Sequence, residues 1–504
     1  MNDLSRVHNS KKNLLNGLIN QFVMLLLTFA SRSIFIYYLG VEYLGINGLY
    51  SNILQLLSLT DLGISNIALF SLYKPIADKD EDKICGLICY YKKIYRNIFF
   101  IILIIGLFLI PFLPSIIDSN LNINDLIGYY ILFLLNTALS YAFVYNRIFI
   151  NADQRIYIIK NTTTIVTVVQ NILQILVMVI WKNYYLYLTV QCLGTLFINL
   201  ILTYQAIKHY PFLKKRSTIP KEEQKGILKS TSDLFIYKIG SMIVHSTDNI
   251  IISVLLGTIF VGYYSNYYMI VTVIINFVNV LINSIATSIG NLGTEGNMDH
   301  QYKIFEHLIF IFQWIISFVS VGMLVLFNDF ILIWLGDSYL LSEPTVAVIV
   351  MNFYIQFIIS PIWIYRENLG FYKEVKYLMI VTAFINIVLS IILGKFIGMM
   401  GIFLATILAR LLTVVWYEPI ILMKKHFKKS VKNYYFLQIR YFLFFVFVYL
   451  ITNFLCSFIS VNGYLTWILK ACLLTVIVNF IYFIFFRKTD TFIFLKNKIL
   501  RRNK

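Results

Sequence analysis

Long apolar runs separated by short polar segments make up most of the chain. Each run comes close to, or exceeds, the roughly 20 residues that an α-helix needs to cross a bilayer. In chain order the runs cover 14–39, 48–73, 94–117, 126–150, 156–181, 184–207, 234–256, 263–292, 304–327, 346–365, 377–397, 402–423, 441–459 and 465–486. The pattern predicts an all-α integral membrane protein with about 14 transmembrane helices. The stretch 328–335 is predicted to lie flat at the membrane surface.

Composition supports the membrane assignment. Of the 504 residues, 59% are hydrophobic and 13% are charged, whereas a soluble domain carries roughly 25% charged residues. Aromatic residues reach 17%, and many tyrosines fall at predicted helix ends, as expected for an interfacial aromatic belt. The five cysteines are scattered, which favours unpaired thiols. The first apolar run is too long for a signal-peptide core, so we expect it to be retained as a helix.

The distribution of Lys and Arg predicts the orientation. Of the 42 cations, 36 lie in alternate polar segments, which include both termini, and only Lys182 and Lys395 lie in the segments between them. Because cytoplasmic loops are enriched in Lys and Arg, both termini are predicted to be cytoplasmic. The net charge of +18 is then a consequence of topology, and nucleic-acid binding is not expected.

A short internal repeat indicates two related halves. Gly40 and Gly45 follow the first predicted helix, and Gly257 and Gly262 follow the seventh with the same spacing. Six helices separate the two copies, so both halves enter the membrane in the same direction and form a parallel repeat. The predicted organisation is a six-helix lobe at 1–208, a cytoplasmic linker at 209–229, a second six-helix lobe at 230–424, and helices 13 and 14 with a basic tail at 425–504.

Ionisable residues at predicted membrane depth are the candidates for function. The sequence contains no phosphate-binding loop, zinc-ligand spacing or nucleophile elbow, so no catalytic residue, metal site or bound cofactor is predicted. Charged groups within a membrane are costly and usually face a cavity or a partner. The predicted cavity residues are Arg32, Asp61, Lys238, His245, Asp248 and Arg410, with Arg147 and Arg366 at the cytoplasmic mouth.

Arg32 is the first of these candidates. It lies eight residues before Gly40, and Asn249 lies eight before Gly257 with Asp248 beside it, so the repeat places polar groups at matching depth. A guanidinium suits two-point contact with phosphate, and we interpret Arg32 as a cavity residue that binds an anionic headgroup. The alternative is a structural ion pair with Asp61 or Asp248.

The other candidates also have two interpretations each. Asp61, followed by Gly63, either lines the cavity or clamps two helices together. Lys238, His245 and Asp248 are spaced seven and three apart and share one helix face. His245 either carries protons or bonds a neighbouring hydroxyl.

The arginines near helix ends are less specific. Arg147 and Arg366 either attract headgroups or extend to the interface as arginines commonly do. Arg410 is deeper and is either a cavity residue or a structural one. Lys470 is predicted to be interfacial.

The sequence around several of these residues resembles that of a known family. The stretches 32–45 and 248–265, with Asp61-Leu62-Gly63 and Lys74-Pro75, are similar to Wzx-type polysaccharide flippases of the multidrug/oligosaccharidyl-lipid/polysaccharide exporter superfamily. The resemblance implies two lobes around a cationic cavity, alternating access, and an undecaprenyl-diphosphate-linked oligosaccharide as cargo. It gives Arg32 the part that arginines play toward the diphosphate in lipid II relatives, with Lys238 as a second cation. It also implies that helices 13 and 14 form a groove for the lipid tail.

The expected setting is the inner membrane of a bacterium, with membrane lipid and a polysaccharide polymerase as partners. Transport would be driven by the membrane potential or by coupling to H⁺ or Na⁺. Two alternatives remain at this stage. One is an extruder-like exporter of small amphiphiles, whose cavity would favour carboxylates. The other is a membrane enzyme, such as a polymerase, of envelope polysaccharide synthesis, which would lack the parallel repeat.

Overall fold

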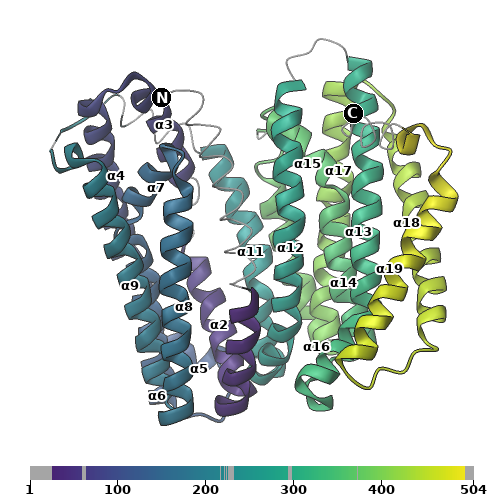
Figure 1. Cartoon of the computed structure of the whole chain (residues 1–504), viewed down its shortest axis with the longest axis horizontal. Helices are drawn as coiled ribbons and strands as arrows, with labels where there is room; N and C mark the ends of the chain where they lie inside the picture. Colours follow the sequence, from purple (N-terminus) through teal and green to yellow (C-terminus); the bar gives the residue numbers. More distant parts are fainter. Residues whose placement is uncertain are drawn as a thin grey trace. The chain divides into compact units, whose positions relative to one another are not determined.

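The computed structural model describes residues 25–58, 64–215, 217–220, 222, 224, 232–292, 298–371 and 373–493. All regular elements in these ranges are helices (Figure 1). Eleven helices among the described residues are long and apolar enough to cross a membrane, and a shorter apolar helix covers Leu25–Leu39. The all-α fold class is confirmed, and the chain is a multi-pass membrane protein. Asp61 and part of the predicted linker (216, 221, 223 and 225–229) lie outside the described residues.

The chain forms two compact units, Met1–Gly262 and Tyr263–Lys504. In the first unit α6 and α8 both pack along α9, α3 packs against α7, and α11 packs against α2 and α5. After Leu25–Leu39, the helices of this unit are α2 (Val41–Leu57), α3 (Ile64–Asp78), α4 (Glu81–Phe108), α5 (Leu113–Ile116), α6 (Ile123–Tyr141), α7 (Val144–Ala152), α8 (Ile156–Trp181), α9 (Tyr184–His209) and α11 (Ser232–Leu256), with 3₁₀ turns at Ile110–Phe112 and Pro211–Lys214. Since α11 belongs to this unit, the compact units divide later in the chain than the predicted lobes, whose boundaries stay a prediction.

The two copies of the glycine repeat meet at one helix crossing within the first unit. A Cβ added to Gly45 would lie 2.1 Å from the carbonyl oxygen of Thr258, and one added to Gly262 would lie 2.3 Å from that of Val41. Only glycine permits such close approach of two backbones. The repeat found in the sequence therefore marks a reciprocal contact between the start of α2 and the start of α12 (Thr258–Leu292).

The other glycine of each copy starts the helix. Gly40 and Gly257 have φ angles of 87° and 105°, a region that favours glycine. The segment between α5 and α6 is bonded to both helix starts, because the Ser119 hydroxyl donates to Glu42 at 2.6 Å and the Thr258 N–H donates to the carbonyl of Asp118 at 3.0 Å. The first residues of α2 and α12 are thus hydrogen-bonded to the same short segment of the chain.

In the second unit, α13 packs against α14, α18 and α19. The last helix is held to α13 by Trp314 and Tyr482, whose rings stack 5.8 Å apart, and by the Trp467 indole, which donates to the carbonyl of Leu326 at 3.2 Å. After α12 the helices are α13 (Met298–Leu335), α14 (Glu343–Ile358), α15 (Ser360–Asn368), α16 (Leu378–Leu412), α17 (Val414–Ile421), a π-helical turn (Leu422–Phe427), α18 (Val431–Cys456) and α19 (Tyr464–Phe486), with a 3₁₀ turn at Asp337–Tyr339.

Two predicted boundaries were wrong, and one predicted break is present within a longer helix. The run 126–150 is divided into α6 and α7, because Phe143 has non-helical angles. The break predicted between the runs 377–397 and 402–423 is present inside α16, where Ile397 and Gly398 have non-helical angles. The stretch 328–335 is not a separate surface segment but the end of α13. Its polar residues have internal partners, since Asn328 accepts from Tyr267 at 2.7 Å and Asp329 pairs with Lys470 at 2.7 Å.

Candidate functional site

Arg32 and Asp248 both lie in the first unit. Arg32 is half-buried on the helix Leu25–Leu39, and it is close enough to Tyr187 of α9 for the two side chains to interact electrostatically. The neighbouring Phe35 packs edge-on against Tyr187 at 5.2 Å. Asp248 is half-buried on α11, and Asn249 beside it is buried. The shared cavity expected for Arg32 and Asp248 stays a prediction.

The remaining residues of the predicted α11 face are only partly placed. Lys238 and His245 lie on α11, but their side chains are outside the described part of the structure.

Arg147 is half-buried on α7, and its neighbour Asn146 donates to Thr203 of α9 at 3.0 Å. Arg147 is thus on a short helix that is bonded to α9.

In the second unit, Arg410 makes a helix-joining bond. It lies near the end of α16 and donates to the carbonyl of Asn352 on α14 at 3.2 Å. This hydrogen bond joins the two helices. It supports the structural interpretation of Arg410, because the side chain has a partner within the protein. Its predicted role in a cavity stays untested.

Arg366 has a partner that sequence reasoning missed. Its side chain is 2% exposed and lies 2.6 Å from the carboxylate of Glu418, which is 0% exposed. A second carboxylate, that of Glu367, is 3.2 Å away and more than half exposed. Arg366 therefore does not extend to an interface but joins α15 to α17. An acidic residue inside an apolar run was the available signal for Glu418, but only the cations of that region were considered.

Further polar contacts surround this ion pair. The hydroxyl of Tyr365 donates to the carbonyl of Gln301 at 3.1 Å, and the side chain of Gln301 bonds His426 at 2.9 Å. Glu374, which lies outside the spans, pairs with Lys425 at 3.0 Å. Burial raises the pKa of Glu374, but the hydrogen bond from Lys425 and the neighbouring lysine charges outweigh it, and the net pKa is lower than usual. This end of the second unit is fixed by paired charges.

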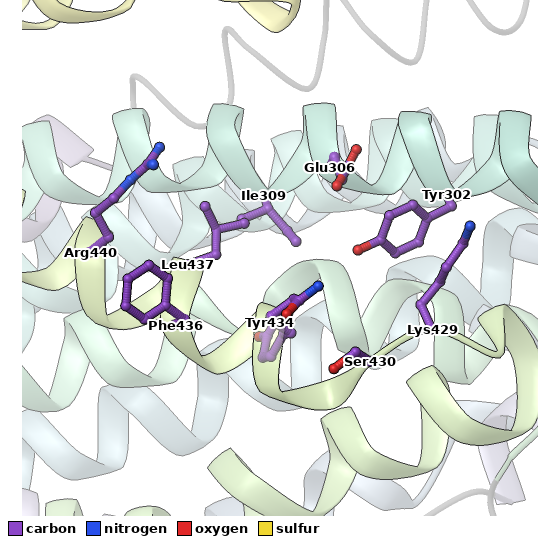
Figure 2. A pocket seen from close by; sticks show the side chains of 10 residues that line it. Tyr302, Glu306, Ile309, Lys429, Ser430, Tyr434, Phe436, Leu437 and Arg440 are labelled. Atoms are coloured by element: carbon purple, nitrogen blue, oxygen red, sulfur yellow. The ribbon is translucent and has the colours of Figure 1, made fainter.

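A cavity of about 410 Å³ lies between α13 and α18. Figure 2 shows Tyr302 and Lys429 at one end, Arg440 at the other, and Glu306 between them. Lys429 is already paired with Asp299 at 3.0 Å, and its amine lies 5.5 Å from the centre of the Tyr302 ring. One of the two cations of this cavity is therefore engaged within the protein.

A second cavity, of about 400 Å³, lies between α12 and the helices α14 and α15. Four apolar side chains contribute to its wall. The polar residues that line it are Asn279, Gln356, Ser360, Trp363, Glu367 and Asn368. None of them is among the candidates from sequence: five are uncharged, and Glu367 lies just beyond the predicted run 346–365. Among the described residues, no three His, Cys, Asp or Glu are grouped as metal ligands.

Comparison with known proteins gives the fold. No sequence-family model and no curated protein sequence matches the chain. Among solved structures, the lipid II flippase MurJ in an inward closed conformation matches with a TM-score of 0.64 and 17% identity over 95% of this chain and 99% of that one. An inward-facing multidrug resistance MATE family transporter of the MOP superfamily matches with a TM-score of 0.61 and 12% identity, over 76% of this chain and 90% of that one. A MATE transporter of Vibrio cholerae matches with a TM-score of 0.54 and 13% identity, over 85% and 99%.

These likenesses define a class of fold. The chain has the architecture of MOP superfamily transporters over nearly its whole length. At identities of 12–17% the likeness extends to the fold and not to the cargo.

Proposed function

We propose that the chain is a flippase that moves undecaprenyl-diphosphate-linked oligosaccharide repeat units from the inner to the outer leaflet by alternating access. The product would be used in cell-surface polysaccharide assembly. One observation carries the proposal: the match to a lipid II flippase extends over 95% of this chain, whereas the two MATE transporters cover 76% and 85%. Of these three structures, the one that matches over the largest share of this chain is thus a lipid II flippase.

Arg32 would bind the diphosphate of the cargo. It is a half-buried cation on the first apolar helix, and its guanidinium can contact two phosphate oxygens at once. Tyr187 beside it offers a hydroxyl to the same anion. Lys238 and Asp248, on α11 of the same unit, complete the proposed polar lining.

The membrane potential is sufficient to drive export. A headgroup with about two negative charges that moves outward across an inside-negative membrane gains roughly 2.3 kcal/mol per charge per 100 mV, or about 4.6 kcal/mol. Coupling to H⁺ through His245, or to Na⁺, would add to this driving force. The proposed setting is the cytoplasmic membrane of a bacterium, with both termini inside and a polysaccharide polymerase as partner.

Genetic complementation in the host tests the proposal. Cells depleted of the chain should accumulate the lipid-linked glycan on the inner leaflet, and the wild-type gene should clear it. Arg32→Ala should not clear it, and Arg32→Lys should clear it partly because the charge remains. Arg155→Ala is the matched control, since Arg155 is a cation of the same unit that pairs with Asp153. Depletion without any accumulation of lipid-linked glycan would refute the proposed cargo.

A second candidate function is export of small amphiphiles, and the likeness to the MATE fold at a TM-score of 0.61 favours it. This function predicts that cells expressing the chain lose ethidium faster than cells that do not. The flippase proposal predicts equal ethidium efflux in the two strains.

A further inference from the structure

The cavity between α12, α14 and α15 has a polar face along one continuous stretch. Gln356, Ser360, Trp363 and Glu367 are spaced four, three and four residues apart, the spacing that places residues on one side of a helix. Asn279 adds a polar group from a second part of the lining, on α12. A volume of about 400 Å³ is within the usual range for small-molecule sites. The cavity is thus large enough for a ligand and is polar along one side.

Two of its polar groups are buried and lack partners. Ser360 is 0% exposed, and within the described residues neither its hydroxyl nor the indole N–H of Trp363 has a hydrogen-bond partner. Buried polar groups are normally bonded, because leaving one unpaired is costly. Both groups belong to residues of the cavity wall, and within the described residues neither is committed to another hydrogen bond.

The lining offers donors and acceptors with little net charge. The amides of Asn279, Gln356 and Asn368 each donate and accept, the indole donates, and the carboxylate of Glu367 accepts. No Lys, Arg or His is part of this lining, so a diphosphate would find no cation here. Glu367 lies 3.2 Å from Arg366, but Arg366 is also paired with Glu418 at 2.6 Å, so the lining keeps some negative charge, which disfavours a diphosphate. A neutral polyhydroxylated molecule fits best, because each of its hydroxyls donates and accepts.

We propose that this cavity is a sugar subsite, which holds one sugar ring of the cargo by its hydroxyl groups. The inference rests on the proposed flippase function and adds to it a location for the glycan in the second unit. The sugar is then recognised by Asn279, Gln356 and the wall around Trp363, and these residues take no part in binding the diphosphate. The apolar side chains of the cavity contact the C–H face of the ring.

Binding to the purified full-length protein in detergent tests the subsite. Two probes are used: the lipid-linked glycan that accumulates in depleted host cells, and undecaprenyl diphosphate without sugar. The wild type should bind the glycan probe at least tenfold more tightly. Asn279→Leu, Gln356→Leu and Trp363→Phe should each weaken the glycan probe by about three- to tenfold, the usual range for one hydrogen bond, and leave undecaprenyl diphosphate unchanged.

The control and the opposing outcomes separate this inference from the proposed function. Asn453→Leu makes the same chemical change at an exposed residue of α18 and should alter neither affinity. Equal wild-type affinity for the two probes, or a variant that weakens both probes or neither, overturns the sugar subsite while the flippase function stands. A wild type that binds neither probe overturns the function itself. Asn279 is exposed, so its variant should fold even if the Trp363 variant does not.

Discussion

The buried ion pair of Arg366 and Glu418 gives a quantitative prediction. In Arg366→Met, the carboxylate of Glu418, which is 0% exposed, loses the cation 2.6 Å away. The least costly response is for the carboxyl to fold in its protonated form. For a carboxyl with an ordinary unfolded pKa of about 4.3, protonation at pH 7 costs about 2.7 units at 1.36 kcal/mol each, or about 3.7 kcal/mol. This value lies within the range of about 3–5 kcal/mol for breaking a buried pair.

The variant should therefore melt well below the wild type at pH 7, and less so in acid. With a shift of about 2–4 °C per kcal/mol for a unit of this size, 3.7 kcal/mol corresponds to roughly 7–15 °C. The folded variant holds a proton that the unfolded chain lacks above pH 4.3, so the loss should grow by about 1.4 kcal/mol per pH unit from there to pH 7. Thermal unfolding in detergent at pH 5 and pH 7 measures both quantities.

Two further variants test the same reasoning. Glu418→Gln leaves Arg366 with Glu367 at 3.2 Å as a remaining counter-ion, so its loss should be smaller and nearly independent of pH. The double variant Arg366→Met with Glu418→Gln removes both charges and should recover part of the stability lost in Arg366→Met. An Arg366→Met protein that melts within 2 °C of the wild type at pH 7, or whose loss is the same at pH 5, would refute the argument.

Three further predictions concern packing, topology and a surface carboxylate. Gly45→Ala should lower the free energy of unfolding by about 1–3 kcal/mol, since its Cβ would overlap the backbone of Thr258. Gly322→Ala, whose Cβ would have no atom within 4 Å, should leave the stability unchanged. Equal melting temperatures of the two variants would contradict the helix crossing. A single cysteine introduced at Lys215 should react with an impermeant maleimide only in opened cells, because the cation distribution places it inside, and labelling of intact cells would reverse the topology. Glu374→Gln should lower the stability by less than about 1 kcal/mol at pH 7. Because the pKa of Glu374 is lowered in the folded protein, the stability difference between the variant and the wild type should vanish as the pH falls below about 4.3. A stability difference that grows in acid would contradict the pairing with Lys425.

The architecture was largely predictable because helix length and apolarity depend on local sequence. The cation distribution and the glycine repeat can also be read directly from the sequence. The repeat marks a helix crossing in the structure, at Gly45 and Gly262. Helix breaks were less predictable: Phe143 lies within an apolar run, where hydropathy alone does not show whether a helix continues. The break at Gly398, in contrast, falls in the gap between two predicted runs.

The site was less accessible from sequence, since it depends on which helices pack together. Arg366 stood out as a charge, but its partner Glu418 is 52 residues away in the chain and is identified only by the packing of α15 against α17. Ser360 and Trp363 are unremarkable in an apolar run until the fold places them at a cavity beside α12. Sequence reasoning favoured charges, and the uncharged polar groups of the cavity needed the structure.

The central claim, transport of a lipid-linked oligosaccharide, is tested most directly by translocation in vesicles. The purified chain is reconstituted with the lipid-linked glycan from depleted cells, a potential of about 100 mV is imposed, and glycan exposure on the side of positive potential is followed with a membrane-impermeant lectin. We predict rapid exposure with the wild type, faster with the potential than without it, and little exposure with Arg32→Ala at equal protein content. Exposure by the wild type that is no faster than in protein-free vesicles would contradict the account.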